Sequence, residues 1–505
     1  MPGMRMSLSN RWLILVIVSI ALFLIVVDMT ILYTALPRLT QALGASGAQR
    51  LWIVSAYPLV VASLLPAAGA LGDKYGHKPM FLAGLAVFGL ASLAAAYAPA
   101  PVPLIGARAT LAVGAALMMP ATLAIIRHEF ADPDERSLAI GIWAAVASGG
   151  AAFGPLAGGA LLEHFWWGSV FLVNVPIVLA TLPLAWLAIA RRPGNRDQAW
   201  DLPGSILVML GLLCLTYGIK EAGRPSAPLP GVLIALALGA VLLAAFARRQ
   251  LRLASPMIDF RLFRNRVFSS GAVAAVVAAM ALIGAELILS QRMQLVHGLS
   301  PWETGLYILP IPLASLVAGP AAGIAMRRLG APAIIGAGLA ASALGLAGYI
   351  GALGHSLGIE LACLAVLGLG VGATMTGASS AMLLSAPAER VGMAASIEEV
   401  SYELGGALGI AALGSLMALL HGHAFVAPPG ASGVPAAARE NLDDALHYAR
   451  SLPEGLSAQF AGAARDAFET AFNGTFLTAA ALLAVTAAAV LLMQQRQIGR
   501  LRRDD

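Results

Sequence analysis

The sequence predicts an all-α membrane protein with fourteen transmembrane helices, and three observations lead to this prediction. Of its 505 residues, 59% are apolar and only 11% are charged, whereas soluble domains have about 25% charged residues. Apolar windows of about 20 residues, the length that spans a bilayer, recur along the whole chain. The Lys and Arg residues gather in alternate connections between these windows, as in multi-pass proteins. So few charges could not cover the surface of a soluble protein of this length.

Each expected helix is an apolar window that ends at a charged connection or at one containing Pro and Gly. In chain order, the fourteen windows are residues 11–36, 51–72, 80–98, 102–126, 137–162, 168–190, 202–220, 230–247, 266–291, 302–326, 331–352, 358–385, 391–420 and 474–494. The first window is too long for a signal-peptide core and has no small-x-small cleavage site, so we expect an uncleaved helix. If the N-terminus is cytoplasmic, most of the 31 Lys and Arg residues lie on the cytoplasmic side, which places both termini there.

One internal repeat predicts the domain organisation. Residues 69–76 (GALGDKYG) follow the second expected helix, and residues 323–330 (GIAMRRLG) follow the tenth. We therefore expect an N-terminal six-helix bundle (1–195), an inserted helix pair (196–252) and a C-terminal six-helix bundle (253–505), because parallel six-helix repeats are typical of secondary transporters. The C-terminal bundle includes an extracytoplasmic loop, 421–473, whose second part could form one or two amphipathic helices. Two interpretations of this loop stay open, a solvated connector and a role in gating.

Several motifs resemble the major facilitator superfamily, and specifically its fourteen-helix drug:proton antiporters. They are residues 28–37 (DMTILYTALP), 69–78 (GALGDKYGHK), 150–159 (GAAFGPLAGG), 171–176 (FLVNVP) and 256–263 (PMIDFRLF). Residues 51–54 and 394–405 look similar to the QacA/SmvA-type exporters of quaternary ammonium and other lipophilic cationic compounds. This resemblance implies the major facilitator fold, with helices arranged as 6+2+6 in pseudo-symmetric bundles. It also implies proton-driven export across the bacterial cytoplasmic (inner) membrane.

Acidic residues inside the expected helices are candidates for proton coupling. A charged side chain at a helix centre costs about 2.5–3.5 kcal/mol on insertion, so few are expected without a use. We expect Asp28, Arg108, Glu399 and Glu403 to couple transport to protons, and the spacing of four puts the two glutamates on one helix face. Asp28 and Arg108 could instead form a purely structural pair, and the two roles are compatible. For the glutamates the alternative is a solvated acidic helix end.

A lipophilic cation would be recognised by negative charge and by aromatic faces, because a quaternary ammonium has no hydrogen-bond donor. The candidate substrate-binding residues are Glu398, Glu399, Glu286, Trp52, Tyr57, Trp143 and Tyr307. Glu398 is about 100° from Glu399 around the helix and could face elsewhere. Trp and Tyr near helix ends are also typical interface anchors, and Glu286 could be an outer-vestibule residue.

Two Gly-containing motifs are candidates for conformational roles. Gly69, Asp73, Lys74, Gly76 and Lys78 would form a cytoplasmic latch, in which Asp73 accepts hydrogen bonds from the first amides of the third helix. A second set would bend the fifth helix and let another helix approach closely at the interface of the two halves: Gly150, Gly154, Pro155, Gly158 and Gly159. Topology determination and generic helix packing are the alternatives.

The sequence carries no motif of an ATP-driven pump, metal site or hydrolase. It has no GxxxxGK[ST] phosphate loop, no Cys/His cluster with metal spacing and no GxSxG elbow. We therefore expect no enzyme activity, cofactor, metal or nucleic-acid partner, and a monomer that works with protons and small lipophilic cations in a lipid bilayer. The predicted function is proton-coupled export of cationic drugs and biocides. The alternatives are export of an endogenous metabolite or anionic antibiotic by the same fold and, less favoured, a non-transporting membrane sensor.

Overall fold

The computed structural model describes residues 11–504 except 46, 195–200, 223–228, 254–255, 257, 388–389, 432–433, 436–437 and 440. The described part is helical and contains no strand. The first elements are α1 (Arg11–Ala42), α2 (Gly47–Tyr75), α3 (His77–Ala96), α4 (Pro101–Glu129), α5 (Pro133–His164), α6 (Ser169–Leu172), α7 (Asn174–Ala188), α8 (Leu202–Ala222) and α9 (Leu229–Gln250). The later elements are η1 (Phe260–Arg264), α10 (Arg266–Gln291), η2 (Arg292–Val296), α11 (Pro301–Ile308), α12 (Pro310–Leu329), α13 (Ala331–Ala352), α14 (Leu357–Ser385), α15 (Val391–Ala424), α17 (Leu442–Ala449) and α18 (Glu454–Asp504).

The predicted set of membrane spans is confirmed. In the described residues, thirteen helical segments are long and apolar enough to cross a bilayer, and the two parts of α5 together make a fourteenth. Each coincides with one of the windows expected from the sequence. The two parts of α5, 133–151 and 156–164, are bent by 41°, and the break contains Gly154 and Pro155, as expected where a proline removes an intrahelical hydrogen bond. The expected domain boundary at residues 195 and 196 lies outside the described residues.

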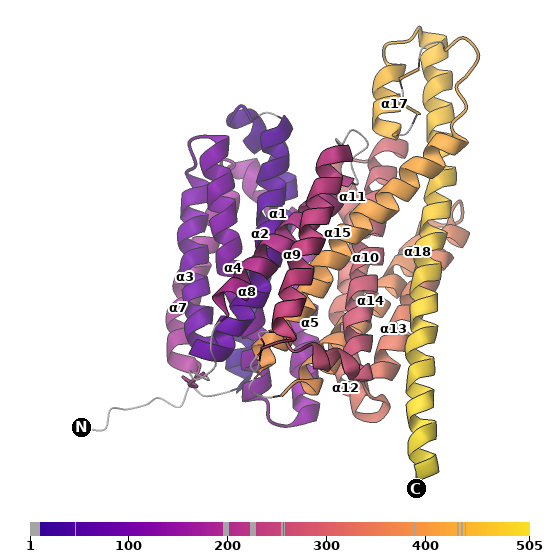
Figure 1. Cartoon of the computed structure of the whole chain (residues 1–505). Coiled ribbons are helices and arrows are strands. Elements are labelled where there is room, and N and C mark those ends of the chain that lie inside the picture. The colour runs from indigo at the N-terminus through magenta and orange to yellow at the C-terminus, as the bar shows by residue number, and fades with distance from the viewer. Residues whose placement is uncertain are drawn as a thin grey trace.

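The start of the last helix was predicted wrongly. The expected window begins at residue 474, whereas α18 begins at Glu454. The additional turns carry Arg465, Asp466 and Glu469, which lower the mean hydropathy of any window there. The same turns bury apolar side chains such as Phe460 and Phe468, so this part is an amphipathic helix. Together with α17 it forms a helical projection beyond the end of the bundle (Figure 1).

Two seams join the N-terminal and C-terminal helices, and both are backbone contacts. In the first, α2 packs on α15, where a Cβ added at Gly69 would collide with the carbonyl of Gly392. In the second, α5 packs on α12, where Gly141 and Gly319 are in the same relation. Small residues allow this close approach between membrane helices.

The inserted pair α8 and α9 covers the first seam. Val208, Leu212 and Phe246 form a small hydrophobic cluster with side chains that include Ala70 of α2 and Val400 of α15, and α8 contacts both of those helices (Figure 1). At the end of the pair, Asp201 bonds to α9 through the Arg249 Nε (2.8 and 3.0 Å) and Gln250 (2.8 Å). Burial raises the pKa of the Asp201 carboxyl, but hydrogen bonds from the Gly204 amide and from these two side chains outweigh burial, and the pKa lies below its ordinary value.

Candidate functional site

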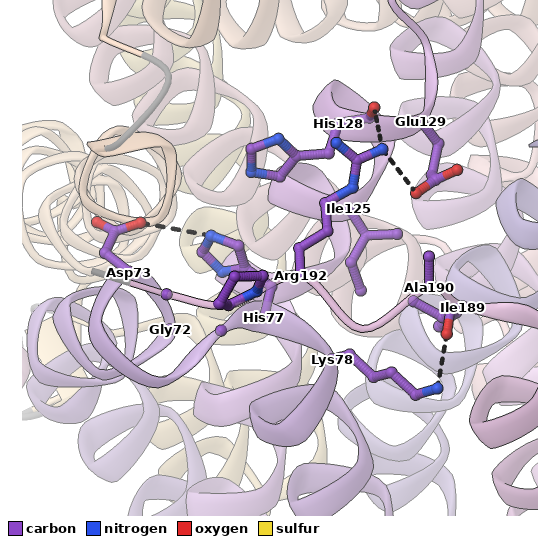
Figure 2. Close-up of a pocket in the computed structure, with 13 residues that line it drawn as sticks. Gly72, Asp73, His77, Lys78, Ile125, His128, Glu129, Ile189, Ala190 and Arg192 are labelled. Atoms are coloured by element: carbon purple, nitrogen blue, oxygen red, sulfur yellow. Dashed lines mark hydrogen bonds and ion pairs between the residues drawn. The ribbon is translucent and has the colours of Figure 1, made fainter. Parts of the chain in front are cut away.

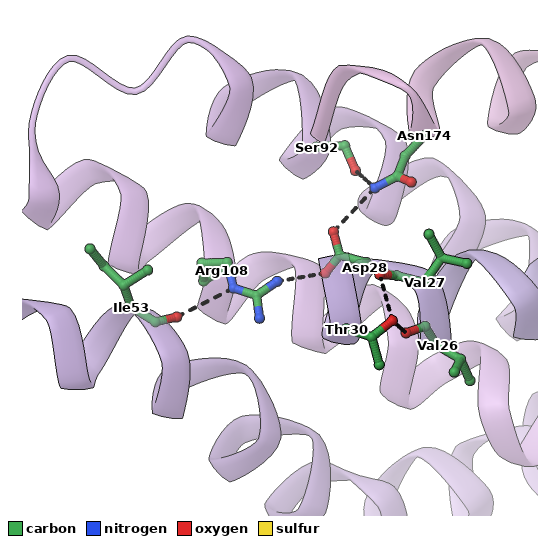
Figure 3. A network of polar contacts seen from close by, with 8 residues as sticks. All are labelled: Val26, Val27, Asp28, Thr30, Ile53, Ser92, Arg108 and Asn174. Atoms are coloured by element: carbon green, nitrogen blue, oxygen red, sulfur yellow. Dashed lines mark hydrogen bonds and ion pairs between the residues drawn. The ribbon is translucent and has the colours of Figure 1, made fainter. Parts of the chain in front are cut away.

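A buried ion pair lies in the N-terminal helices. The Nη1 of Arg108, on α4, donates to the Oδ2 of Asp28, on α1, over 2.5 Å, and the two side chains are 2% and 0% exposed. The amide of Asn174, on α7, donates to the other Asp28 oxygen at 3.2 Å and to the Ser92 hydroxyl at 3.2 Å. Figure 3 shows this network, in which both oxygens of Asp28 are bonded. The structure therefore brings the two predicted coupling residues together. It also adds Asn174 to the site, a residue that belongs to the motif at 171–176 but was not predicted to contact Asp28.

Arg108 is also held by aromatic rings. Its guanidinium carbon lies 4.6 Å from the ring centroid of Tyr57 and 6.0 Å from that of Phe171, distances at which a cation is attracted by the ring face. Its Nε donates to the carbonyl of Ile53 at 3.4 Å. Tyr57 was predicted to bind substrate, but in this conformation it is fully buried and its ring packs on Arg108.

A second group of carboxyls lies on α15. Glu398 is fully buried and accepts a hydrogen bond from the hydroxyl of Ser379 on α14. The Oε2 of Glu398 and the Oε1 of Glu399, a residue that is 4% exposed, have no hydrogen-bond partner. Among the described residues, no Lys or Arg forms an ion pair with either one. Two buried acids without a cation require protonation or a positively charged ligand, since an uncompensated buried charge is strongly unfavourable.

The faces of α15 separate these acids. Gly392 and Ser396 lie against Gly69 of α2, and the helical repeat puts Glu399 and Glu403 on the same side. Glu403 is half-buried and interacts electrostatically with Glu399 on its own helix and with Tyr57 on α2. Glu398 instead points towards α14 through its bond to Ser379. The sequence spacing had predicted this difference of orientation.

The other predicted substrate residues do not gather at this site. Trp143 is 3% exposed and donates to the hydroxyl of Thr122 at 3.1 Å inside the N-terminal core. Trp52 is 46% exposed and stacks on Tyr217 of α8, with ring centroids 6.2 Å apart. Both therefore have structural roles in this conformation.

Glu286 is half-buried and, in the described part of the chain, has no hydrogen-bond or ion-pair partner. Val276 lies against Gly405 and Met280 against Gly409, so α10 and α15 run in the same direction. Glu286 is thereby level with position 415, about 18 Å along the helix axis from Glu403 at 1.5 Å per residue. It is a separate candidate from the α15 acids.

A polar network in the C-terminal helices was not predicted. The Arg292 Nε donates to both carboxylate oxygens of Glu469 (2.9 and 3.0 Å), and its Nη1 donates to the hydroxyl of Tyr349 at 3.3 Å. The Tyr349 and Tyr307 hydroxyls are 2.8 Å apart, and Tyr307 also bonds to Glu360. Tyr307, a predicted substrate residue, thus belongs to this network. In the sequence, only the position of Arg292 directly after an apolar window could have indicated that it belongs to a site.

Asp73 caps a different helix from the one expected. Its carboxylate accepts hydrogen bonds from the amides of Gly392 (2.9 Å) and Met393 (3.0 Å) at the start of α15. We expected the first amides of α3, and this was wrong, because α3 begins after Gly76 without a side-chain cap. The anion still lies at a helix N-terminus, where it is stabilised. The helix is 319 residues away in sequence, so the contact joins α2 to the C-terminal helices.

The other latch residues lie beside this contact. Gly76 has φ +95°, a conformation that favours glycine, and a Cβ there would meet the carbonyl oxygen of Arg192 at 2.7 Å. Lys78 donates to the carbonyls of Trp186 and Ile189, both at 2.6 Å, near the end of α7. The Lys74 ammonium lies 5.5 Å from the ring centroid of Tyr75.

A pocket of about 410 Å³ adjoins the latch residues, with Asp73, His77, His128 and Arg192 among its lining residues (Figure 2).

The glycines of α5 do not all face the expected partner. Gly150, Gly154 and Gly158 lie against α1, near Val26, Thr30 and Ile31. Only Gly159 approaches a C-terminal helix, 3.8 Å from the Trp302 ring of α11. The expected close approach of another helix is present, but α1 is the neighbour of three of these glycines, because small residues every four positions line one helix face. The bent helix itself packs on α12 of the C-terminal helices.

A helical bundle with this many spans and with acids enclosed between its helices defines a multi-pass membrane transporter. The sequence matches the Major Facilitator Superfamily over residues 18–410, and the chain belongs to this family. It is 41% identical over 480 residues to the methyl viologen resistance protein SmvA of Salmonella typhimurium, covering 95% of this chain and 97% of that one. It is 37% identical over 495 residues to the multidrug efflux pump LfrA of Mycolicibacterium smegmatis, with 97% of each chain covered. The family match and these relatives identify the protein as a transporter of this superfamily.

One further relative and one solved structure are also similar to this chain. The tetracenomycin C resistance and export protein of Streptomyces glaucescens is 31% identical over 498 residues, covering 97% of this chain and 92% of that one. The structure of the human organic anion transporter MFSD10 matches with a TM-score of 0.61 at 15% identity, covering 94% of this chain and 99% of that one. The structural match confirms the predicted major facilitator fold.

Proposed function

We propose that this protein exports lipophilic, mainly cationic drugs and biocides, including quaternary ammonium compounds and dyes, in exchange for protons. The observation that carries the proposal is the pair of buried carboxyls on α15, Glu398 and Glu399, each with one oxygen that has no hydrogen-bond partner among the described residues. Such groups accept either protons or a positively charged ligand, so the two compete. The names of the relatives, one a methyl viologen resistance protein and another a multidrug efflux pump, support this class of substrate.

In this mechanism, the Asp28–Arg108 pair responds to proton binding. Protonation of Asp28 removes the negative charge that holds Arg108, and an arginine cannot lose its own charge. Arg108 must then find another partner, which changes the contact between α1 and α4. Protons arriving from outside would neutralise Asp28, Glu399 and Glu403 and release the cation, and deprotonation on the cytoplasmic side would restore the site.

The arrangement in the membrane is part of the same proposal. Two six-helix halves, 1–195 and 253–505, would rock about the central site, with 196–252 as an inserted pair. The excess of Lys and Arg in alternate connections supports cytoplasmic termini in the bacterial inner membrane, and a monomer is sufficient. One-for-one exchange of a proton for a monovalent cation moves no net charge, so the pH gradient drives it, and one pH unit supplies about 1.4 kcal/mol, which is enough to concentrate the cation outside about tenfold.

The test is proton-coupled efflux of ethidium in everted membrane vesicles. Wild-type protein should remove ethidium while a pH gradient is present, and added ethidium should dissipate that gradient. Asp28→Asn should abolish both effects while the protein stays inserted. Asp132→Asn is a matched control, because Asp132 caps α5 through the amides of Asp134 and Glu135, and asparagine caps a helix equally well. Normal coupled efflux by Asp28→Asn would remove Asp28 from the mechanism.

A second substrate class is favoured by one relative, which is named for resistance to and export of tetracenomycin C. By that analogy, the protein would export an endogenous metabolite or an anionic antibiotic with the same fold. A panel of cations and anions tested on the protein in proteoliposomes separates the two, since only the transported class collapses the pH gradient.

A further inference from the structure

The hydroxyl of Tyr57 is a polar group whose use is not apparent in this conformation. The residue is fully buried, and its oxygen has no hydrogen-bond partner in the described part of the chain. A buried hydroxyl without a partner costs free energy, whereas phenylalanine would fill the same space without that cost. A tyrosine at this position is therefore best explained by a hydrogen bond that forms in another state of the transport cycle.

Two acidic side chains act electrostatically on Tyr57, Asp28 and Glu403. Its ring face is occupied by Arg108, 4.6 Å away. Both oxygens of Asp28 are already bonded, one to Arg108 and the other to Asn174. Glu403, on α15, is the acidic group that acts on Tyr57 from the C-terminal helices.

The packing of the first seam independently places Glu403 near the level of Tyr57 along the helix axes. Asp73 bonds to Gly392 and Gly69 contacts Ser396, so α2 and α15 run in opposite directions. Going back along α2 from Gly69 to Tyr57 therefore corresponds to going forward along α15 to about position 406. Tyr57 lies within about one helical turn, or 5.4 Å, of the level of Glu403.

We propose that Tyr57 is a positioning residue for proton coupling, whose hydroxyl donates a hydrogen bond to the deprotonated Glu403 carboxylate when α2 and α15 move against each other. The proton of Glu403 leaves to the cytoplasm, and the tyrosine keeps its own proton. A hydrogen bond to the charged form of an acid favours that form. The ring would meanwhile hold Arg108 against Asp28, so that a single side chain contacts the ionisable groups of both sets of helices. This inference rests on the proposed cation–proton antiport.

The test is the pH dependence of tetraphenylphosphonium binding to the purified full-length protein. Wild type should bind the cation at high pH and lose it as protons compete. Tyr57→Phe keeps the ring and removes the hydroxyl, so Glu403 should give up its proton less readily. We expect the midpoint of binding to move up by about one pH unit, the effect of losing one hydrogen bond to a charged group. Affinity at the high-pH limit should stay within about twofold of wild type.

Two controls keep the outcome specific. Tyr217→Phe, on the partly exposed face of α8, makes the same chemical change and should leave the midpoint unchanged. Tyr57→Phe combined with Glu403→Gln should behave like Glu403→Gln alone, because the acceptor is then missing. An unchanged midpoint in Tyr57→Phe would overturn the inference, as would an equal loss of affinity at every pH, which would mean that the hydroxyl contacts substrate. A wild-type protein whose cation binding ignores pH would instead overturn the proposed antiport.

Discussion

Two arginine–carboxylate pairs, one in each set of helices, are built alike but differ in their access to water. Arg108 bonds to Asp28 beside the ring of Tyr57, and Arg292 bonds to Glu469 with its guanidinium 5.0 Å from the ring centroid of Phe472. Asp28 is 0% exposed, whereas the side chain of Glu469 is 30% exposed.

This difference in exposure predicts different roles for the two ion pairs. We expect the enclosed Asp28–Arg108 pair to respond to proton binding and the Arg292–Glu469 pair to be structural. If Arg292 moves away, water can solvate Glu469, which can then stay charged. The pair is therefore expected to add only modestly to the free energy of unfolding. Water cannot replace Arg108 as the partner of the enclosed Asp28. The charge of Asp28 must therefore be balanced by Arg108 or removed by a proton. Burial, more than the kind of ion pair, is why we propose Asp28 as the site of coupling.

The largest effect should come from breaking the enclosed pair. Arg108→Gln leaves Asp28 buried without its cation and should lower stability by about 3–5 kcal/mol, measured as a loss of melting temperature in detergent. Adding Asp28→Asn to that variant should restore most of the stability, since no charge is then left unpaired, but should not restore transport. If the double variant were as unstable as Arg108→Gln, the ring contacts of Arg108 would be its main role.

Glu398 and Glu399, which form no ion pair with an arginine among the described residues, can be compared with Asp28 in the same assay. Glu399→Gln should reduce proton-coupled ethidium efflux by tenfold or more, roughly 1.4 kcal/mol, because this acid lies on the α15 face towards α2. Glu398→Gln should have a smaller effect, because Glu398 bonds to Ser379 within the C-terminal helices. Initial rates in everted vesicles measure both. Equal losses would show that the two orientations make no functional difference.

A smaller effect is expected at the accessible pair. Arg292→Gln should cost about 1 kcal/mol of stability, less in high salt, and leave efflux within about twofold of wild type. Thermal melting at low and high ionic strength, with efflux rates alongside, checks this. A large loss of efflux at normal stability would place the Arg292 network in the transport cycle.

The smallest effect is expected outside the membrane, at Asp201. Because its pKa lies below the ordinary value, the charged form stabilises the fold at neutral pH. That contribution should be lost as the pH falls from about 4, the unfolded value, through the lower folded value. Asp201→Asn should therefore lower the melting temperature slightly at pH 7 and have a smaller effect at pH 3. A loss of equal size at both pH values would contradict a role for the charge.

The sequence was sufficient for features that depend on local composition. Apolar windows located every span, and the insertion cost of a charge singled out Asp28, Arg108 and the α15 acids. It was insufficient where the partner is remote. Nothing near Asp73 indicates that its carboxylate bonds to amides 319 residues away, and an apolar window cannot detect the amphipathic start of α18. The Arg292 network was missed for the same reason, because its members come from five separate helices.

The glycine contacts described above have a mechanical consequence. Where Gly141 meets Gly319, main chain touches main chain, and no side chain has to change rotamer for the two helices to tilt against each other. Such a backbone contact offers little steric resistance to a change of tilt, whereas one added methyl group at either glycine would push the two helices apart. In the proposed transport cycle, these small residues would therefore set how far the two sets of helices can tilt against each other.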